Sequence, residues 1–250
     1  MAVSLKFVED LELLALDQDN LNILRATLQY PAHPSIKSAK LAHDIIFIVD
    51  ANNCKDSNEG TPDVIWYVWS LILEISKCIP PDHPWQDSLL QAIGHLRGQD
   101  GTVPGMGTGR WEELPYLSMR IRELWNDPTN EMVDEVEEGE FTRWKNQNSF
   151  VARLTSPFFD PGYAFPLWQL RIALEEPPIN GTGQECRLSN QTAFKTGSLC
   201  RDIPHFSMDR WNFWKRRLAE ISADAGNLDL EPAIVTRISD TIKIMEEIST

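Results

Sequence analysis

Residues 61–81 read TPDVIWYVWSLILEISKCIPP, and they decide the fold. The Thr-Pro pair at the start is typical of a helix N-terminus, and the Pro-Pro pair at the end stops the helix. Between these pairs apolar side chains cover almost the whole circumference, and only Ser70, Glu74 and Lys77 form a narrow polar stripe. Because a helix that is apolar nearly all round has to be covered on most sides, we expect it in the middle of a helical bundle.

Apolar residues recur with helical spacing along the rest of the chain, and no segment shows the strict alternation of a half-buried strand. The sequence therefore predicts an all-α fold: a single domain over residues 1–250, built as an irregular bundle of about eight to ten helices without significant sheet. The Gly-rich stretch 98–110 is the one candidate for an internal seam, and a short strand at Ile45–Val49 is the alternative for one helix. The expected helices are Ile36–Val49, Trp85–Leu96, Leu114–Trp125, Trp144–Leu154, Ala164–Leu174, Ser207–Ala225 and Pro232–Ile248, with a weaker one at Cys186–Cys200.

The chain of 250 residues carries 37 acidic and 23 basic residues, for a formal net charge of -14. Nucleic acids and anionic membranes are polyanions, so this charge argues against both as partners. Glu9 and Asp10 interrupt the N-terminus before a signal-peptide-like apolar run forms, and apolar runs such as Ile45–Val49 are too short to span a bilayer. We therefore expect a cytosolic protein without a membrane segment, whose four cysteines are free thiols.

Several motifs of cofactor binding and catalysis are absent from the sequence. The Gly-rich stretch lacks both the Lys-Ser/Thr end and the preceding strand of a phosphate loop. Neither HExxH nor GxSxG occurs, and the five histidines include no i, i+4 pair. The sequence therefore predicts no cofactor, no metal site and no hydrolase triad.

Nine tryptophans are the most informative feature of the composition. Aromatic rings on the inner faces of helices can line a cavity for an apolar small molecule. For any single ring, filling the core is the more common role. For the set, we predict an aromatic-lined helical cavity that binds an apolar substrate. The predicted binding residues are Trp66, Trp69, Trp144, Asn148, Trp168 and Trp211.

Three polar residues on apolar helix faces are candidates for catalysis. Asn148 shares an arc with Trp144 and could orient a ligand carbonyl, although tying two helices together is the favoured interpretation. Glu74, if desolvated, could act as a general acid, although sharing its stripe with Lys77 favours exposure or a simple ion pair. His43 could carry a proton, although histidines on such faces more often make hydrogen bonds within the core.

Four short motifs occur in an order that resembles a known family. They are residues 78–87 (CIPPDHPWQD), 111–117 (WEELPYL), 144–148 (WKNQN) with Phe150 and 152–154 (ARL), and 206–215 (FSMDRWNFWK). Together they resemble the fungal family catalogued as domain of unknown function 3632, over about residues 60–250. The resemblance implies a helical protein of fungal lineage, and it transfers no catalytic residue. It also implies a small-residue and Trp-rich helix at Cys186–Cys200, where this chain has no tryptophan, so this segment could form a remodelled ligand site.

Two functions from different classes fit these features. The first is a cofactor-free enzyme of fungal specialised metabolism, of the cyclase, pericyclase or isomerase type, which folds an apolar substrate by shape and orientation. It requires a cavity of at least about 300 Å³. The second is a non-catalytic helical module for protein–protein interaction, which predicts an exposed apolar patch in place of an enclosed pocket. The tryptophans slightly favour the first.

Overall fold

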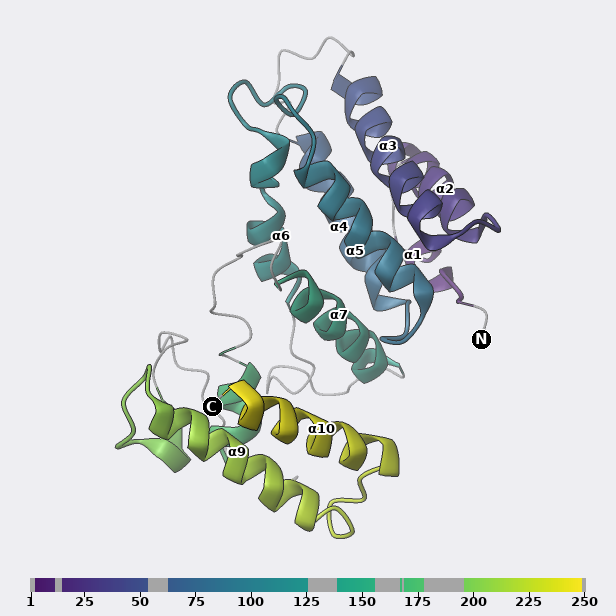
Figure 1. The fold of residues 1–250 in the computed structure, drawn as a ribbon. Coiled ribbons are helices and arrows are strands. Elements are labelled where there is room, and N and C mark those ends of the chain that lie inside the picture. Colours follow the sequence, from purple (N-terminus) through teal and green to yellow (C-terminus); the bar gives the residue numbers. More distant parts are fainter. Residues whose placement is uncertain are drawn as a thin grey trace. The chain divides into compact units, whose positions relative to one another are not determined.

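A computed structural model describes residues 3–11, 15–53, 63–125, 139–155, 167, 169–177 and 196–248 (Figure 1). The chain divides into two compact units, Met1–Pro161 and Gly162–Thr250, and each unit is described by itself. The prediction of a single domain stays a prediction. The Gly-rich stretch 98–110 lies inside the first unit, away from the division at Pro161.

The described residues are helical, as predicted, and the extended pairing among them is one isolated bridge between Thr102 and Arg110. The first unit contains α1 (Lys6–Glu9), α2 (Ala15–Gln29), α3 (Pro34–Asn53), α4 (Asp63–Lys77), α5 (Pro84–Arg97), η1 (Trp111–Glu113), α6 (Leu117–Leu124) and α7 (Glu140–Leu154). The second contains η2 (Arg171–Glu175), η3 (Ser198–Cys200), α9 (Met208–Ala223) and α10 (Pro232–Ile248).

The sequence pattern located most of these helices, with instructive differences. Ile45–Val49 lie inside α3, so the helix is right and the strand alternative is wrong. The helix expected from Leu114 begins only at Leu117, because Leu114 and Tyr116 both have left-handed backbones with positive φ. Helices α1 and α2 were not predicted. Of the helix expected at Ala164–Leu174, residues 167 and 169–174 are described, and they are helical, with η2 at the C-terminal end. Most of the helix expected at Cys186–Cys200 lies outside the described residues, and Ser198–Cys200 form the 3-10 turn η3.

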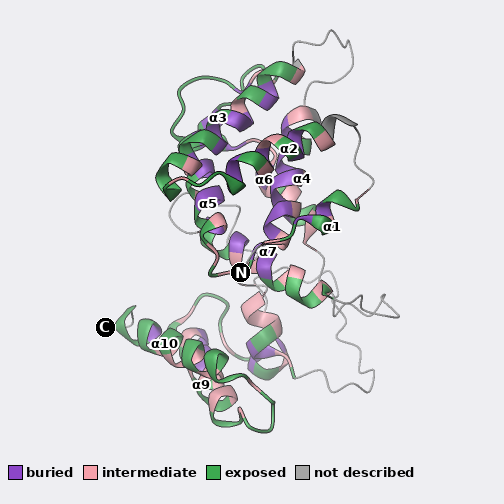
Figure 2. Cartoon of the chain, turned by 90° about the vertical axis from the view of Figure 1, so that its right-hand side faces the viewer, coloured by how far each residue is buried: buried purple, intermediate pink, exposed green. Residues whose placement is uncertain are grey.

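Helix α4 lies in the middle of the first unit, as its sequence predicts. It packs against α2, α3, α6 and α7, and Figure 2 shows buried residues along most of its length. Its buried side chains include Ile65, Val68, Trp69 and Ile72. Helix α5 covers α3 on one side and contacts α7 on another. The first unit is therefore layered around α4, with α5 presenting one face to solvent.

Two buried amides join the end of α4 to α5 and α7. The Gln86 side chain donates from Nε2 to the carbonyl oxygens of Ile79, at 2.8 Å, and Asn146, at 3.2 Å. Asn146 in turn donates from Nδ2 to the carbonyl oxygen of Lys77, at 2.8 Å. Two of these bonds satisfy the carbonyls of Lys77, the last residue of α4, and Ile79, which follows it; carbonyls at a helix C-terminus have no helical partner. The turn between α4 and α5 is thereby fixed on α7.

The second unit contains a helical hairpin of α9 and α10 (Figure 1), and η2 contacts both α9 and η3. Ser207 caps α9, as predicted, by accepting the backbone N–H of Arg210 at 3.2 Å. The helix ends at Ala223, two residues before the predicted end. Its apolar arc packs into a core around Leu174, Phe213 and Met245.

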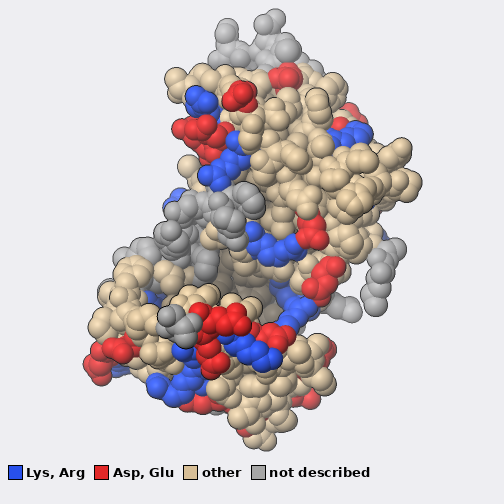
Figure 3. All heavy atoms as spheres, in the orientation of Figure 1, with Lys and Arg blue, Asp and Glu red and all other residues tan. Residues whose placement is uncertain are grey.

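No helix in the described ranges is both long enough and apolar enough to cross a membrane. On the face drawn in Figure 3, lysine and arginine side chains lie next to aspartate and glutamate side chains. The ion pairs of the described residues include Arg120 with Glu123 and Lys77 with Glu74.

We expect Gln86→Leu to lower the free energy of unfolding by about 2 kcal/mol, because the buried carbonyls of Ile79 and Asn146 lose a donor. Urea denaturation followed by circular dichroism measures this difference. Gln29→Leu is the matched control, since Gln29 is exposed at the end of α2. Equal stability of the two variants would show that Gln86 does not hold the turn.

Candidate functional site

A buried ion pair between Glu175 and Arg210 organises the second unit. The two side chains are 0% and 1% exposed. Arg210 donates from Nε to Oε1 of Glu175 at 2.6 Å and from Nη2 to Oε2 at 3.2 Å. The indole N–H of Trp214 also donates to Oε1, at 2.7 Å, and the backbone N–H of Gly197 donates to Oε2, at 2.6 Å. The carboxylate therefore accepts hydrogen bonds from α9 and from the chain just before η3.

These donors keep Glu175 ionised in the interior. Burial alone would raise the pKa of this carboxyl, but the hydrogen bonds from Arg210, Gly197, Trp214 and Cys200 outweigh burial and hold the pKa below its usual value. In contrast to the carboxyl of Glu175, the Cys200 thiol is kept in its neutral form. Burial and its hydrogen bond to Glu175 raise the pKa of Cys200 to about 12. Cys200 is therefore a protonated donor and not a nucleophile.

Local backbone features bring the carboxylate to this point. Glu175 ends η2, a π-helical turn, and such turns are often found at functional sites. Gly197 approaches so closely that a Cβ atom there would lie 2.6 Å from the Cβ of Glu175 and 2.7 Å from its carbonyl oxygen. Only glycine therefore allows the backbone N–H of residue 197 to reach the carboxylate.

A groove of about 590 Å³ lies beside Arg210, and we name it the Trp211 groove. Arg210 lines the groove, and it also donates from Nη1 to the carbonyl oxygen of His205 at 2.9 Å. The rings of Trp211 and Trp214 meet edge to face, with centroids 6.3 Å apart. Apolar side chains form most of the lining. The described lining residues are Leu167, His205, Phe206, Ser207, Met208, Arg210, Trp211, Trp214 and Ile248.

The predicted tryptophans fall into both units. Trp211 lines the Trp211 groove, and its indole N–H donates to the carbonyl oxygen of Met245 at 3.3 Å. Trp69 is fully buried in the first unit and donates to the carbonyl oxygen of Pro115 at 2.8 Å. Trp66 is half-buried there, with the Arg120 guanidinium 5.2 Å from its ring centroid. Trp69 and Trp66 thus fill and cover the core of the first unit, the more common role of such rings.

Two further predicted tryptophans remain. Trp144 is half-buried on α7, and its indole N–H is buried without an acceptor among the described residues. Trp168 lies outside the described residues. Their roles in binding stay predictions.

The three candidates for catalysis lie on three helices of the first unit, and no interaction within the described part of the chain joins them. Asn148 donates from Nδ2 to the carbonyl oxygen of Trp144 in its own helix, at 2.9 Å. The tie between helices expected of it is made by Asn146 two residues earlier. Glu74 is paired with Lys77 at 2.7 Å, the simple pair that its stripe predicts. His43 is exposed on α3, outside the core.

Sequence reasoning missed Glu175, Arg210 and His205. A signal for Arg210 existed, because it precedes Trp214 by one helical turn and so lies on the apolar arc of α9, where a cation needs a buried partner. The partner could not be identified, since Glu175 is 35 residues away. Among the described residues, no three histidine, cysteine, aspartate or glutamate side chains gather as a set of metal ligands.

A family model described as "Protein of unknown function (DUF3632)" matches residues 69–194, just over half of the chain. The match begins in α4 and includes Glu175. It agrees with the resemblance drawn from the sequence motifs. No curated protein and no solved structure matches the chain.

We expect Glu175→Gln to lower the free energy of unfolding by about 3 kcal/mol at pH 7, because Arg210 is left buried without a counter-charge. The folded-state pKa of Glu175 is depressed, so its contribution is complete above the unfolded pKa and is lost as the pH falls through the folded pKa. The difference between wild type and variant should therefore shrink from pH 7 to about pH 3.

Urea denaturation at both pH values measures this difference. Glu220→Gln is the control, because Glu220 lies on the same helix and pairs with Arg217 at the surface. Its effect should stay below about 1 kcal/mol. A difference for Glu175→Gln that is the same at both pH values would contradict the assignment of an ionised, buried carboxylate.

Proposed function

Since the chain belongs to the DUF3632 family of proteins of unknown function, we propose its function from its own residues: it is a cofactor-free enzyme of the cyclase, pericyclase or isomerase type that binds an apolar small molecule in the Trp211 groove. One observation carries the proposal. A groove of about 590 Å³ combines two indole rings with the guanidinium of Arg210, which is held in place by Glu175. This volume lies within the usual range of ligand pockets, and it exceeds the minimum of about 300 Å³ that a small-molecule enzyme of this kind requires.

The polar groups of the groove suit orientation of a ligand. Arg210 is held by Glu175, and Ser207 by its capping bond and by donation to the carbonyl oxygen of Pro204 at 2.9 Å. These groups are fixed before a ligand arrives, which lowers the entropy lost on binding.

His205 is exposed and lines the same groove, so its imidazole can accept a proton from a bound carbon acid and return it at a second carbon. Such a proton shift is balanced without an external oxidant or cofactor. An isomerisation of this kind is the form of catalysis that the groove supports best.

The proposal includes a cytosolic location and the role in fungal specialised metabolism expected from the sequence. Cys78 and Cys200 are free thiols, which are typical of a reducing compartment. Burial raises the pKa of Cys78 to about 11, so this thiol is also unreactive.

The interaction module is the second candidate, and the rim of the groove favours it. Phe206 is 75% exposed and Ile248 is 70% exposed. Exposed apolar side chains beside a groove are also the pattern that receives an amphipathic helix of a partner protein. This candidate predicts that an amphipathic helical peptide displaces a small apolar probe, and that no proton transfer occurs in the groove.

We expect Trp211→Ser to weaken binding of the uncharged dye N-phenyl-1-naphthylamine by about tenfold or more, because the dye loses an indole contact. Trp211→Phe keeps an aromatic ring and should retain most of the affinity. Dye fluorescence measures binding. Trp85→Ser in the first unit is the control, since Trp85 is half-buried outside this groove. Equal affinities of the two serine variants would remove the groove as the binding site.

We expect the protein in D₂O to accelerate exchange of the α-hydrogens of an apolar ketone such as 2-decanone, followed by mass spectrometry. His205→Asn should lower the rate by about 100-fold, as expected for loss of a general base, while dye binding is unchanged. A rate equal in wild type and variant would exclude His205 catalysis, and if dye binding persisted, the result would favour the interaction module.

A further inference from the structure

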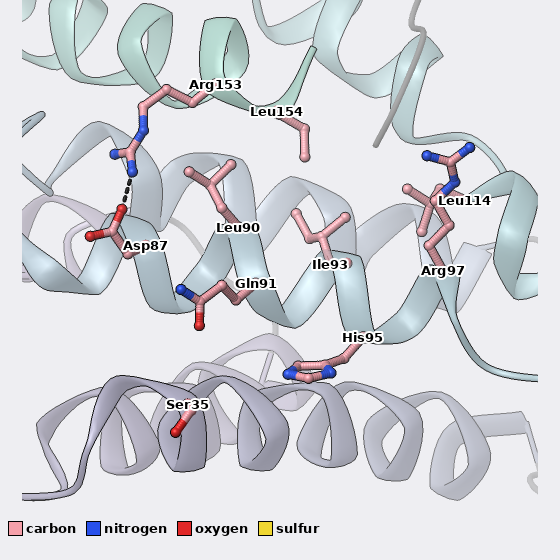
Figure 4. A pocket seen from close by; sticks show the side chains of 11 residues that line it. Ser35, Asp87, Leu90, Gln91, Ile93, His95, Arg97, Leu114, Arg153 and Leu154 are labelled. Atoms are coloured by element: carbon pink, nitrogen blue, oxygen red, sulfur yellow. Dashed lines mark hydrogen bonds and ion pairs between the residues drawn. The ribbon is translucent and has the colours of Figure 1, made fainter. Parts of the chain in front are cut away.

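A second groove, of about 650 Å³, runs along the exposed face of α5 in the first unit (Figure 4). Its floor comes from positions of α5 that follow one another by one helical turn: Asp87, Leu90, Gly94 and Arg97. Leu154 from the end of α7 and Leu114 line it as well. We name it the Gly94 groove. Its described lining residues all belong to the first unit, so it is independent of the Trp211 groove.

Gly94 is the feature that packing does not explain. It lies inside α5, where glycine is less favourable than alanine by about 1 kcal/mol. A Cβ atom built there would meet no described atom within 4 Å, and the backbone is helical, so neither a close approach nor a positive φ requires glycine. The consequence of its missing side chain is an open floor between Leu90 and Arg97. Glycine at this position costs helix stability, and the space that a larger side chain would fill stays open for a ligand.

The chemistry of the lining is amphipathic. Leu90, Ile93 and Leu154 point toward one another on one side of α5 in Figure 4. At one end of the groove Arg153 is paired with Asp87 and also donates to the side chain of Gln86. At the other end Arg97 makes no ion pair with a described residue. An apolar floor with a cation at one end that pairs with none of the described acidic residues is complementary to an apolar ligand with an anion at one end.

We propose that the Gly94 groove binds an amphipathic carboxylate. Its apolar chain lies over Gly94 between Leu90 and Leu154, and its carboxylate pairs with Arg97. Arg153 is paired with Asp87, so Arg97 is the cation of the groove that can attract an anion. The net charge of the whole chain is -14, so a local positive charge of this kind contrasts with the average surface.

Isothermal titration of the full chain with three probes of equal chain length tests the proposal: sodium decanoate, 1-decanol and decyltrimethylammonium. Decanoate should bind at least about tenfold more tightly than decyltrimethylammonium, and Arg97→Gln should remove this preference while leaving 1-decanol unchanged. Arg122→Gln is the matched control, since it removes the same charge from an exposed position of α6. Equal affinities for the anionic and the cationic probe would overturn the proposal.

Gly94→Leu provides the second test. The leucine fills the groove floor and improves helix propensity, so decanoate affinity should fall at least about tenfold while the melting temperature stays equal or rises. A glycine needed only for folding would instead lower the melting temperature. The same titration of Trp211→Ser shows whether decanoate also binds in the Trp211 groove, and the preference for decanoate that depends on Arg97 should persist in this variant. If Trp211→Ser lost decanoate and Gly94→Leu retained it, the ligand would belong to the Trp211 groove and the proposal would be wrong.

Discussion

The negative charge of Glu175 is the constraint around which the second unit is built. An ionised carboxylate in the interior has to be matched by donors, and leaving one partner unmatched costs several kcal/mol. The donors come from three segments: Arg210 and Trp214 from α9, Gly197 from the chain before η3, and Cys200 from η3 itself. The position of the carboxylate therefore fixes where these segments meet, although few apolar side chains are buried there.

This constraint also explains why a groove can stay open beside Arg210. Arg210 is tied on its inner side to Glu175 and on another to the carbonyl oxygen of His205, and Ser207 caps the same turn of α9. The beginning of α9 is thus held by hydrogen bonds, and it does not need the apolar rim residues to pack over it. Phe206 and Ile248 can remain exposed without loosening the unit. The hydrogen bonds of Arg210 and Ser207 therefore stabilise the start of α9, which the exposed apolar side chains at the rim do not cover.

Most of the fold follows from the sequence, because helical periodicity reports which face of a helix is buried. The nearly uniform apolar surface of 61–81 correctly predicts the central position of α4, and the pattern from Pro232 to Ile248 gives α10 with both ends right. The pattern fails where backbone conformation or distant partners decide. Leu114 and Tyr116 delay α6 through left-handed conformations, and the choice of Asn146 over Asn148 as the buried amide depends on where carbonyls at the end of α4 lie.

The sequence predicts an aromatic-lined site and one of its residues, Trp211, but neither its position nor its polar residues. The tryptophan content indicates that large rings are buried or half-buried. A groove, however, forms where no neighbouring element covers a helix face, and helical periodicity does not show which faces stay uncovered. Trp69 and Trp211 lie on similar apolar arcs, yet neighbouring helices cover Trp69, whereas Trp211 lines an open groove. The residues that point to a groove are those that are unfavourable where they stand in a helix. Gly94 inside a helix and Arg210 on an apolar arc are both of this kind, and each lines a groove. Residues that are unfavourable at their position in a helix are therefore better guides to the two proposed grooves in this chain than its aromatic residues are.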